Sequence, residues 1–588
     1  MEIQEKRLLS GTEAIALGAY HSGVKVASAY PGTPSTEILE NLSRYKDVYA
    51  EWSPNEKVAM EVAIGACLGG VRALASMKHV GLNVAADPFF TGSYIGVKGG
   101  LVVISADDPG MHSSQNEQDN RHYALAAKIP MLEPTDSQEA YEFVGMAFDI
   151  SEQYDTPVLL RVTTRISHSK GIVVPDRERQ KAQNSAGFQK NPPKYVMVPA
   201  YARGRHMLVE QRMERLKALT EEISINCVEP GDKKLGVISS GVAYHYAKEI
   251  APDASFLKLG MTNPLPRQMI QSFAKGVKRV VVVEELDPYL ETQVRAMGVK
   301  ASGKEYLPLC GELTPEIVVE GITGKKVQTR EVSMDHVDVP PRPPALCPGC
   351  PHSGTFYAIK KLKLAVIGDI GCYTLSVAPP LETMDSCLCM GASIGMTHGL
   401  EKAMAGTAPA RCVAVLGDST FLHSGITPLM NVAYNKGHST TIILDNRTTA
   451  MTGMQDHPAT GRTLQGEDAP AIDFEALGKA IGIESVRTVD PYDMKNLEKV
   501  LREEINASHS SLIIARRPCI LLRKGEKKRP KRVDPEKCAG CQLCIKIGCP
   551  AISETAEGKA EIDSGICNGC PICEQVCKLD AVQEFMHE

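Results

Sequence analysis

The chain has 588 residues, of which 43% are apolar and 23% are charged. This composition is typical of a folded globular protein, and the length predicts several domains because single cores rarely grow beyond about 250 to 300 residues. The net charge of −5 excludes a global electrostatic preference for nucleic acid or for an anionic membrane surface.

The N-terminal stretch MEIQEKRLLSGTEAIALG lacks the basic start and the continuous apolar core of a signal peptide. No apolar run approaches the roughly 18 residues that a membrane-spanning helix needs. We therefore expect a cytoplasmic protein that binds small molecules and other proteins, with no nucleic acid and no membrane among its partners. Thiols stay reduced in that compartment, so the clustered cysteines are expected to bind metal and not to form disulfides.

From Ser10 to about Thr164, short apolar strands alternate with Ala- and Gly-rich helical stretches. The predicted strands are KVASAY, VRALASM, GLVVISADD and TPVLLRVT. After a polar and then charged connector, alternation resumes with KLGVISSGV, FLKLG and RVVVVEE. It resumes again after the proline-rich stretch 337–346, with LAVIGDIG, RCVAVLGDS, TTIILDN and SLIIARR. This order of strands and helices predicts α/β domains with parallel sheets.

The run RKGEKKRPKR (523–532) follows the last of these strands. We expect it to be a solvated, flexible linker, with docking of an acidic protein as the alternative.

Two cysteine runs follow: residues 538–550 read CAGCQLCIKIGCP and residues 567–578 read CNGCPICEQVCK. The second run has the spacing C-x2-C-x2-C-x3-C, and the first has one extra residue before its last cysteine. In two-cluster ferredoxins three cysteines of a run hold one [4Fe–4S] cluster and the fourth holds the other, whereas a zinc site uses CxxC pairs separated by a longer loop. We therefore predict two clusters, one held by Cys538, Cys541, Cys544 and Cys577, the other by Cys567, Cys570, Cys573 and Cys549.

A tail of this kind transfers single electrons and generates none, so their source is expected upstream. Gly417, Asp418 and Ser419 directly follow the strand RCVAVL, and Asp445 and Asn446 end the strand TTIILDN. A carboxylate and an amide oxygen at two neighbouring strand ends are ligands suited to Mg²⁺ bound to a diphosphate. Turn residues at strand ends are the alternative interpretation.

This pattern resembles the thiamine diphosphate motif, a GDG followed by NN. The resemblance implies that Asp418, Asn446 and the carbonyl of Thr448 hold magnesium, with Gly417 and Ser419 beside the cofactor. The chain departs from the motif twice, since Ser419 replaces the second glycine and Asp445 replaces the first asparagine.

The stretches SAYPGTPSTE, CPGCPH (347–352) and GDIGC (368–372) extend the resemblance to nearly the whole chain, together with MKHVGLNVAADP and SADDPGMHSSQNEQDNR. The chain resembles the 2-oxoacid:ferredoxin oxidoreductase family. That implies an α/β, multidomain thiamine-diphosphate-binding fold with parallel-sheet domains and a C-terminal two-cluster [4Fe–4S] ferredoxin-like domain. The implied divisions are an aminopyrimidine-binding domain (1–183), a connector (184–233), a transketolase-C-like domain (234–336), a diphosphate-binding domain (337–522), the basic linker (523–532) and the ferredoxin-like domain (533–588).

The resemblance further implies thiamine-diphosphate-dependent oxidative decarboxylation of a 2-oxo acid, with coenzyme A accepting the acyl group and the clusters passing electrons to ferredoxin. An aryl 2-oxo acid such as indolepyruvate is the expected substrate, and pyruvate or another 2-oxo acid is the alternative. A small partner subunit, in a heterodimer or an α2β2 assembly, is also implied. Two other readings are a thiamine enzyme without redox output, which the tail cysteines disfavour, and an electron-transfer subunit with vestigial thiamine domains.

For catalysis the resemblance points to Glu56, which would hydrogen-bond the aminopyrimidine ring and promote deprotonation of the thiazolium C2, with Glu61 as the alternative. Thr33 in YPGTPS would lie near the substrate carbonyl. Three more polar residues are candidates for the pocket: His79, His352 and Arg121.

A third [4Fe–4S] cluster is expected close to the cofactor, because a direct electron transfer from there to the tail could be long. The resemblance points to Cys347, Cys350, Cys372 and Cys519 as its ligands. The alternative is that Cys372 and Cys519 are small buried residues and that Cys347 and Cys350 shape a turn.

Overall fold

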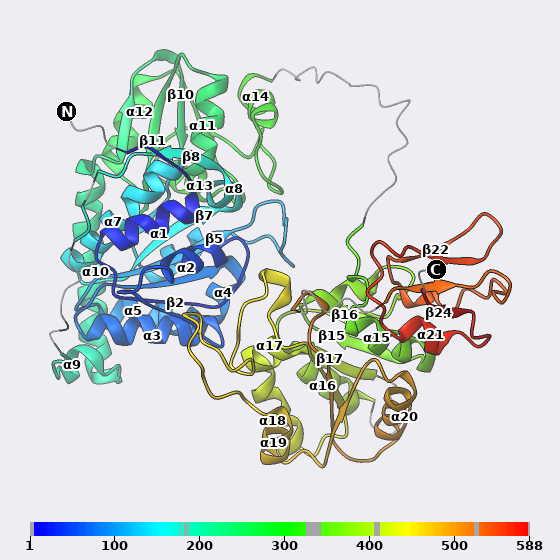
Figure 1. Ribbon diagram of the computed structural model, residues 1–588. Coiled ribbons are helices and arrows are strands. Elements are labelled where there is room, and N and C mark those ends of the chain that lie inside the picture. The colour runs from blue at the N-terminus through cyan, green and yellow to red at the C-terminus, as the bar shows by residue number, and fades with distance from the viewer. Residues whose placement is uncertain are drawn as a thin grey trace. The chain divides into compact units, whose positions relative to one another are not determined.

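The structure is a computed structural model that describes residues 5–176, 178–180, 185, 187–324, 343–404, 412–522 and 529–585. It divides into two compact units, Met1–Val332 and Ser333–Glu588, which are described separately (Figure 1). Within the described ranges, no helix combines the length and the apolar character that crossing a membrane would require.

Seven strands in the described part of the first unit form one sheet, in the order β12-β6-β7-β5-β4-β2-β3. Every neighbouring pair is parallel except β12 with β6. The central strands are buried along their whole length, which explains why they read as continuous apolar runs. The strands are β2 (Val26–Ala29), β3 (Tyr49–Trp52), β4 (Ala73–Lys78), β5 (Leu101–Asp107), β6 (Met131–Leu132), β7 (Val158–Thr163) and β12 (Met261–Asn263).

Helices cover both faces of this sheet (Figure 1). Helices α1 (Gly11–His21) and α7 (Ser137–Tyr154) pack against each other, and so do α3 (Glu56–Leu68) and α5 (Ala86–Ile95). Helix α3 begins where Asn55 accepts a hydrogen bond from the backbone N–H of Val58 at 3.0 Å. The remaining elements are α2 (Thr36–Leu42), α4 (His79–Val84), α6 (Arg121–Ala127), α8 (Thr164–His168) and the antiparallel pair β1 (Arg7–Ser10) and β8 (Lys170–Val173).

A second sheet in this unit has the order β14-β13-β10-β11-β9, parallel except for β9. Strand β12 follows this sheet's β11 in the chain yet joins the first sheet, and the two sheets share one apolar core that includes Met60, Phe89, Leu259 and Phe273. The elements are β9 (Asn226–Glu229), β10 (Asp232–Ser239), β11 (Ala254–Leu259), β13 (Arg279–Val283), β14 (Ala301–Ser302), α9 (Pro192–Tyr195), α10 (Pro199–Glu222), α11 (Gly241–Ile250), α12 (Arg267–Gly276), α13 (Tyr289–Ala296) and α14 (Pro315–Thr323).

The described residues of the second unit form a parallel sheet in the order β16-β15-β17-β18-β20-β19. Its carboxyl edge carries the ends of four adjacent strands, and this edge holds the candidate cofactor residues. The elements are β15 (Ala365–Gly368), β16 (Ser386–Cys387), β17 (Cys412–Gly417), β18 (Thr440–Asp445), β19 (Ser485–Val489), β20 (Ser511–Arg516), α15 (Pro351–Leu362), α16 (Ala392–Ala403), α17 (Asp418–Thr420), α18 (Ile426–Tyr434), α19 (Phe474–Ile481) and α20 (Met494–Ile505).

The tail forms two small antiparallel sheets and packs against the parallel-sheet domain of its unit. Its elements are β21 (Lys531–Val533), β22 (Ile552–Glu554), β23 (Ala560–Ile562), α21 (Ile572–Val576) and β24 (Val582–Glu584). Ile547 and Ile572 of the tail share an apolar core with Phe356 and Leu497 of the domain.

The basic run 523–532 was expected to be a solvated linker, and residues 523–528 lie outside the described ranges. At its end the chain differs from that expectation, because Lys531 begins β21 and is buried. Its ammonium forms an ion pair with Glu574 at 2.8 Å. The tail is therefore anchored by strand pairing directly after the undescribed residues.

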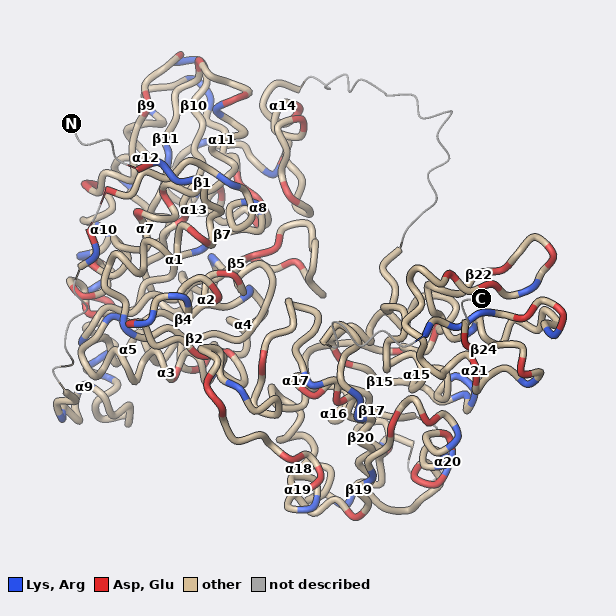
Figure 2. The backbone as a smooth tube through the Cα atoms, viewed as in Figure 1, with Lys and Arg blue, Asp and Glu red and all other residues tan. Residues whose placement is uncertain are grey.

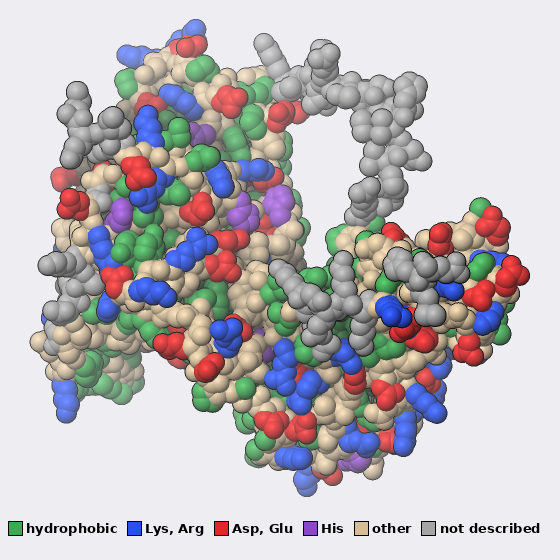
Figure 3. Space-filling model, in the orientation of Figure 1, with side chains coloured by type: hydrophobic (Ala, Val, Ile, Leu, Met, Phe, Trp, Pro, Cys, Tyr) green, Lys and Arg blue, Asp and Glu red, His purple; other side chains and the backbone are tan. Residues whose placement is uncertain are grey.

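Acidic and basic residues are interspersed along the backbone of each unit (Figure 2). The face drawn in Figure 3 likewise mixes hydrophobic, basic and acidic side chains. This mixture of signs agrees with the small net charge of the chain.

Candidate functional site

The predicted diphosphate ligands meet at the carboxyl edge of the second unit's sheet. Asp418 follows β17 and Asn446 follows β18, and these two strands are direct neighbours. Thr448 comes two residues later, and all three side chains are buried. Parallel strands place their carboxyl ends at the same edge, so residues separated in sequence by an entire helix come together here.

The Asp418 carboxylate is held by backbone donors on both of its oxygens. Its Oδ1 accepts from the N–H of Ser419 at 2.8 Å, and its Oδ2 accepts from the N–H of Arg447 at 2.7 Å. The Nε2 atom of His457 lies 3.2 Å from Oδ2, while Nδ1 of the same ring accepts from the N–H of Ala459. That contact leaves the proton on Nε2, which is buried and has no hydrogen bond of normal geometry among the described residues.

A second histidine borders the same edge. His352, in the first turn of α15, is buried, and burial lowers its pKa to about 4, so the ring is neutral near pH 7. Its Nε2 lies 3.4 Å from Nδ2 of Asn446, which makes it an acceptor for that amide and turns Oδ1 of Asn446 away from the histidine. A neutral histidine thus helps to orient a predicted magnesium ligand.

The two departures from the motif have local explanations. Asp445 forms ion pairs with Arg516 at 2.7 Å and with Arg447 at 3.1 Å, so its charge is neutralised within the protein. Ser419 accepts a hydrogen bond from Thr449 at 3.0 Å. A Cβ on Gly417 would stand 3.1 Å from the ring of Tyr373, so this position favours glycine. The buried carboxylate and amide oxygens fit a magnesium ion. The imidazole N–H of His457, which makes no hydrogen bond of normal geometry with any described residue, fits a diphosphate oxygen.

The four cysteines proposed for the third cluster are brought together beside this edge. Cys372 follows β15, Cys519 follows β20, and the loop of Cys347 and Cys350 precedes α15. Burial raises the pKa of Cys350, and the neighbouring Cys347, Cys372 and Cys519 raise it further. Burial together with Cys519 and Cys347 raises the pKa of Cys372 to about 11. Cys350 and Cys519 are buried, Cys372 is half-buried and Cys347 is exposed. Thiols this close together are arranged as ligands of a common metal centre would be, because a bound cluster stabilises the thiolate forms.

The tail contains a mainly apolar cavity at the position of the first predicted cluster. Cysteines line it, and they are the expected set: Cys538, Cys541, Cys544 and Cys577. The Sγ of Cys577 accepts a hydrogen bond from the N–H of Ala581 at 3.3 Å, a contact of the kind that tunes cluster potentials. The second cysteine run therefore contributes to the group formed by the first.

Cys549 joins the other group despite the extra residue before it. Gly548 has φ +73 and turns the chain after a short 3₁₀ turn, Ile545–Ile547. Burial raises the pKa of Cys570 to about 11, and the neighbouring Cys549 and Cys567 raise it as well. The pKa of Cys573 is raised by burial and by the same thiols. The left-handed conformation of Gly548 thus accommodates the extra residue between Cys544 and Cys549.

In the first unit, Glu56 occupies the first position of α3 and is buried. A Cβ on Gly81 would stand 2.6 Å from Oε1 of Glu56, so the carboxylate passes directly over this glycine of α4. Glu61 is instead partly exposed and forms an ion pair with Lys57 one turn away. Of the two glutamates considered from the sequence, Glu56 has the environment of a functional group.

Thr33 lies in the loop that follows β2, and its carbonyl accepts a hydrogen bond from the hydroxyl of Ser113 at 3.4 Å. Lys78, the last residue of β4, reaches the same segment and donates to the carbonyl of Ser113 at 2.6 Å. His79 is buried next to it with Nε2 on Asn116, at 3.1 Å from Oδ1. The sequence analysis did not identify Lys78 as a candidate. Its position at the end of a predicted strand, directly before His79, could have indicated it.

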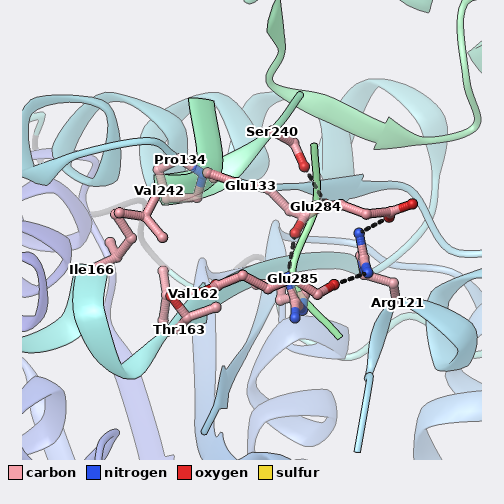
Figure 4. Close-up of a pocket in the computed structure, with 13 residues that line it drawn as sticks. Arg121, Glu133, Pro134, Val162, Thr163, Ile166, Ser240, Val242, Glu284 and Glu285 are labelled. Carbon is pink, nitrogen blue, oxygen red and sulfur yellow. Dashed lines mark hydrogen bonds and ion pairs between the residues drawn. The ribbon is translucent and has the colours of Figure 1, made fainter. Parts of the chain in front are cut away.

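Arg121, a candidate for the substrate pocket, is instead bonded to carboxylates of the protein itself. It is fully buried, donates to both oxygens of Asp119 and to Glu284 at 2.6 Å, and lies over the ring of Tyr289. A small cavity beside it is lined by carboxylates and arginines from both sheets of this unit (Figure 4). Neither Glu56 nor Thr33 lines this cavity, so it is a structural charge cluster separate from the predicted site.

Comparison with known proteins gives two family models. The model of the thiamine-diphosphate-binding domain of pyruvate flavodoxin/ferredoxin oxidoreductase matches residues 17–224. The model of the C-terminal TPP-binding domain of thiamine pyrophosphate enzymes matches residues 369–515. The first range contains Thr33 and Glu56, and the second contains Asp418 and Asn446.

Among curated proteins, the indolepyruvate oxidoreductase subunit IorA of Archaeoglobus fulgidus is 41% identical over 98% of this chain and 97% of its own length. The IorA subunit of Methanothermobacter thermautotrophicus is 43% identical over the same shares. The 2-oxoglutarate synthase subunit KorA of that organism is 22% identical over 52% of this chain and 95% of its own.

Proposed function

The chain belongs to the family of the indolepyruvate oxidoreductase subunits IorA, and on this premise we propose that it converts an aryl 2-oxo acid such as indolepyruvate to an aryl-acyl-CoA and CO2. The chain is a thiamine-diphosphate-dependent 2-oxoacid:ferredoxin oxidoreductase. The aryl substrate is proposed from the IorA relatives. One observation carries the coupling of decarboxylation to electron transfer: the diphosphate residues and a group of four cysteines share the carboxyl edge of one sheet. Decarboxylation and electron acceptance would then occur side by side.

Asp418, Asn446 and the carbonyl of Thr448 would hold magnesium, and through it the diphosphate of the cofactor. When bound, thiamine diphosphate supplies the electron sink for the loss of CO2. Glu56 would hold a proton in hydrogen-bond contact with the aminopyrimidine ring, and its burial at a helix start would keep that contact dry. Thr33 would contact the substrate carbonyl. His457 would donate from Nε2 into the diphosphate site.

The contacts of the cysteine groups support an electron route through three clusters. Cys519 lies close enough to Asp418 for their charges to interact. The loop of Cys347 and Cys350 contacts the second tail group, because Asn568 donates to the carbonyl of Pro348 at 2.6 Å. Cys573 of that group is in turn close to Cys544 of the first tail group. Electrons would pass from the cofactor to the sheet-edge cluster, then to the Cys549 group, then to the Cys538 group, and from there to ferredoxin.

We propose a small partner subunit as well, since the relatives are themselves named as subunits. The activity test is anaerobic reduction of ferredoxin by the reconstituted complex with coenzyme A and indolepyruvate, phenylpyruvate or pyruvate. Faster turnover of the aryl acids at equal concentration supports the proposal. Preference for pyruvate would overturn the substrate assignment, and a purified complex that binds no thiamine diphosphate would leave only an electron-transfer role.

A further inference from the structure

Lys78 is a buried lysine at the carboxyl end of a central strand, β4, between β5 and β2. Its side chain is 8% exposed. The stem runs along the loop after β2, since a Cβ on Gly32 would stand 3.1 Å from the Cβ of Lys78 and 3.8 Å from its Cδ. The lysine is therefore held against the loop that contains Thr33.

The ammonium has few partners for a buried charge. It donates to the carbonyl of Ser113 at 2.6 Å and lies 3.5 Å from the hydroxyl of the same residue. Among the ion pairs closer than 4.0 Å in the described residues, none includes Lys78. The nearby Asp108 carboxylate is already engaged by the hydroxyls of Ser114 and Thr164, at 2.5 and 2.7 Å. An ammonium carries three donors, so capacity for an anionic ligand remains.

Two other buried cations near the carboxyl end of β4 differ from Lys78, because they form ion pairs. Arg121 is paired with Asp119 and Glu284, and Arg161 with Asp107 and Glu133. Both arginines are needed to neutralise buried carboxylates. Burial accordingly lowers the pKa of Lys78 to about 8, with the charge of Asp108 opposing the shift, while those carboxylates raise the pKa of Arg161. A buried charge without a partner ion is costly and is retained where a ligand supplies the counter-charge.

The residues that follow Lys78 approach the proposed catalytic glutamate. Three residues after it, Gly81 lies under the carboxylate of Glu56, with an ideal Cβ only 2.6 Å from Oε1. The segment from Lys78 to Gly81 thus contacts both the Thr33 loop and Glu56. A 2-oxo acid is an anion whose carboxylate is bonded directly to the reacting carbonyl carbon, so a cation at this position complements its charge.

We propose that Lys78 binds the carboxylate of the 2-oxo acid substrate. This inference rests on the proposed function and adds the residue that recognises the anionic group common to all 2-oxo acids. Lys78 binds the group that departs as neutral CO2, so its interaction is strongest before the C–C bond breaks. Its loss is therefore expected to raise KM without lowering kcat.

The test uses the complete holoenzyme with its partner subunit and compares Lys78→Met, Lys78→Arg and the control Lys98→Met. Lys98 is an exposed lysine of the same domain. Lys78→Met should raise the KM for the 2-oxo acid roughly 10- to 100-fold, the usual worth of a charge-assisted hydrogen bond, while kcat is not lowered. Lys78→Arg should recover part of the affinity, and Lys98→Met should match the wild type.

A binding measurement separates recognition of charge from a structural role. The inhibition constant of 3-phenylpropionate should rise by the same factor in Lys78→Met, while that of its uncharged amide and the content of thiamine diphosphate stay unchanged. Unchanged KM and unchanged inhibition by the carboxylate would overturn the inference, and so would equal weakening of the acid and the amide. If the wild-type complex oxidises no 2-oxo acid, the proposed function fails, and the inference fails with it.

Discussion

The imidazole Nε2 of His457 lies 3.2 Å from Oδ2 of Asp418, with both side chains buried. Two backbone N–H groups hold the same carboxylate, and the ring's other nitrogen is fixed by Ala459. Asp418 is consequently oriented before any ion binds. Preorganisation of this kind lowers the cost of assembling a magnesium site, so the site should depend strongly on this one carboxylate.

Asp418→Ala is therefore expected to abolish retention of thiamine diphosphate, because magnesium loses its anionic ligand. The measurement is the cofactor content of protein that has passed through gel filtration. Ser419→Gly, which restores the second glycine of the motif and removes the hydrogen bond from Thr449, is the matched control and should retain the cofactor. Full cofactor content in Asp418→Ala would contradict the assignment.

Glu56→Gln should still bind the cofactor but slow the exchange of its C2 proton by roughly 10² to 10⁴, the usual contribution of a positioned acid–base group. Exchange into deuterated buffer, followed by NMR, provides the measurement. Glu61→Gln removes a partly exposed glutamate that is paired with Lys57, and exchange should be unaffected. Slow exchange in Glu61→Gln and normal exchange in Glu56→Gln would assign the role to Glu61.

Anaerobic iron analysis should find about twelve irons per chain if all three cysteine groups hold [4Fe–4S] clusters. Cys347→Ala should lower this number by about four and leave the tail clusters intact, as judged by EPR of the reduced protein. Cys310→Ala serves as control, because this exposed cysteine belongs to none of the three groups. About eight irons in fully reconstituted wild-type protein, with no change in Cys347→Ala, would exclude the third cluster.

Arg121→Met should destabilise the protein by about 3 to 5 kcal/mol, since it leaves the buried carboxylates of Asp119 and Glu284 without their partner. Urea unfolding of the complete chain measures the loss. Arg165→Met removes a partly exposed pair with Glu312 and should cost less than about 1 kcal/mol. A similar small cost for both variants would show that the cluster is not structural.

The sequence by itself determined the elements whose signal is local. Buried central strands read as apolar runs, so β4, β5, β17 and β18 were predicted within a few residues. Short peripheral strands such as β1, β3, β9 and β19 were not predicted, because they are partly exposed and carry no continuous apolar run. The spacing within each cysteine run is also local, and it led directly to the two proposed tail groups.

The tertiary structure alone decided which strand ends are neighbours. The order β15-β17-β18-β20 brings Cys372, Asp418, Asn446 and Cys519 to one edge, although more than 140 residues separate the first from the last. Burial likewise distinguished Glu56 from the exposed Glu61. Among the described residues Lys78 is a buried cation without a partner ion, whereas Arg121 is neutralised by buried carboxylates. Residue type and spacing set the chemistry available at each strand end. Only the packing of the sheet decides which of these groups lie close enough to act together and which are already paired, because solvent exclusion and strand order are properties of the assembled fold.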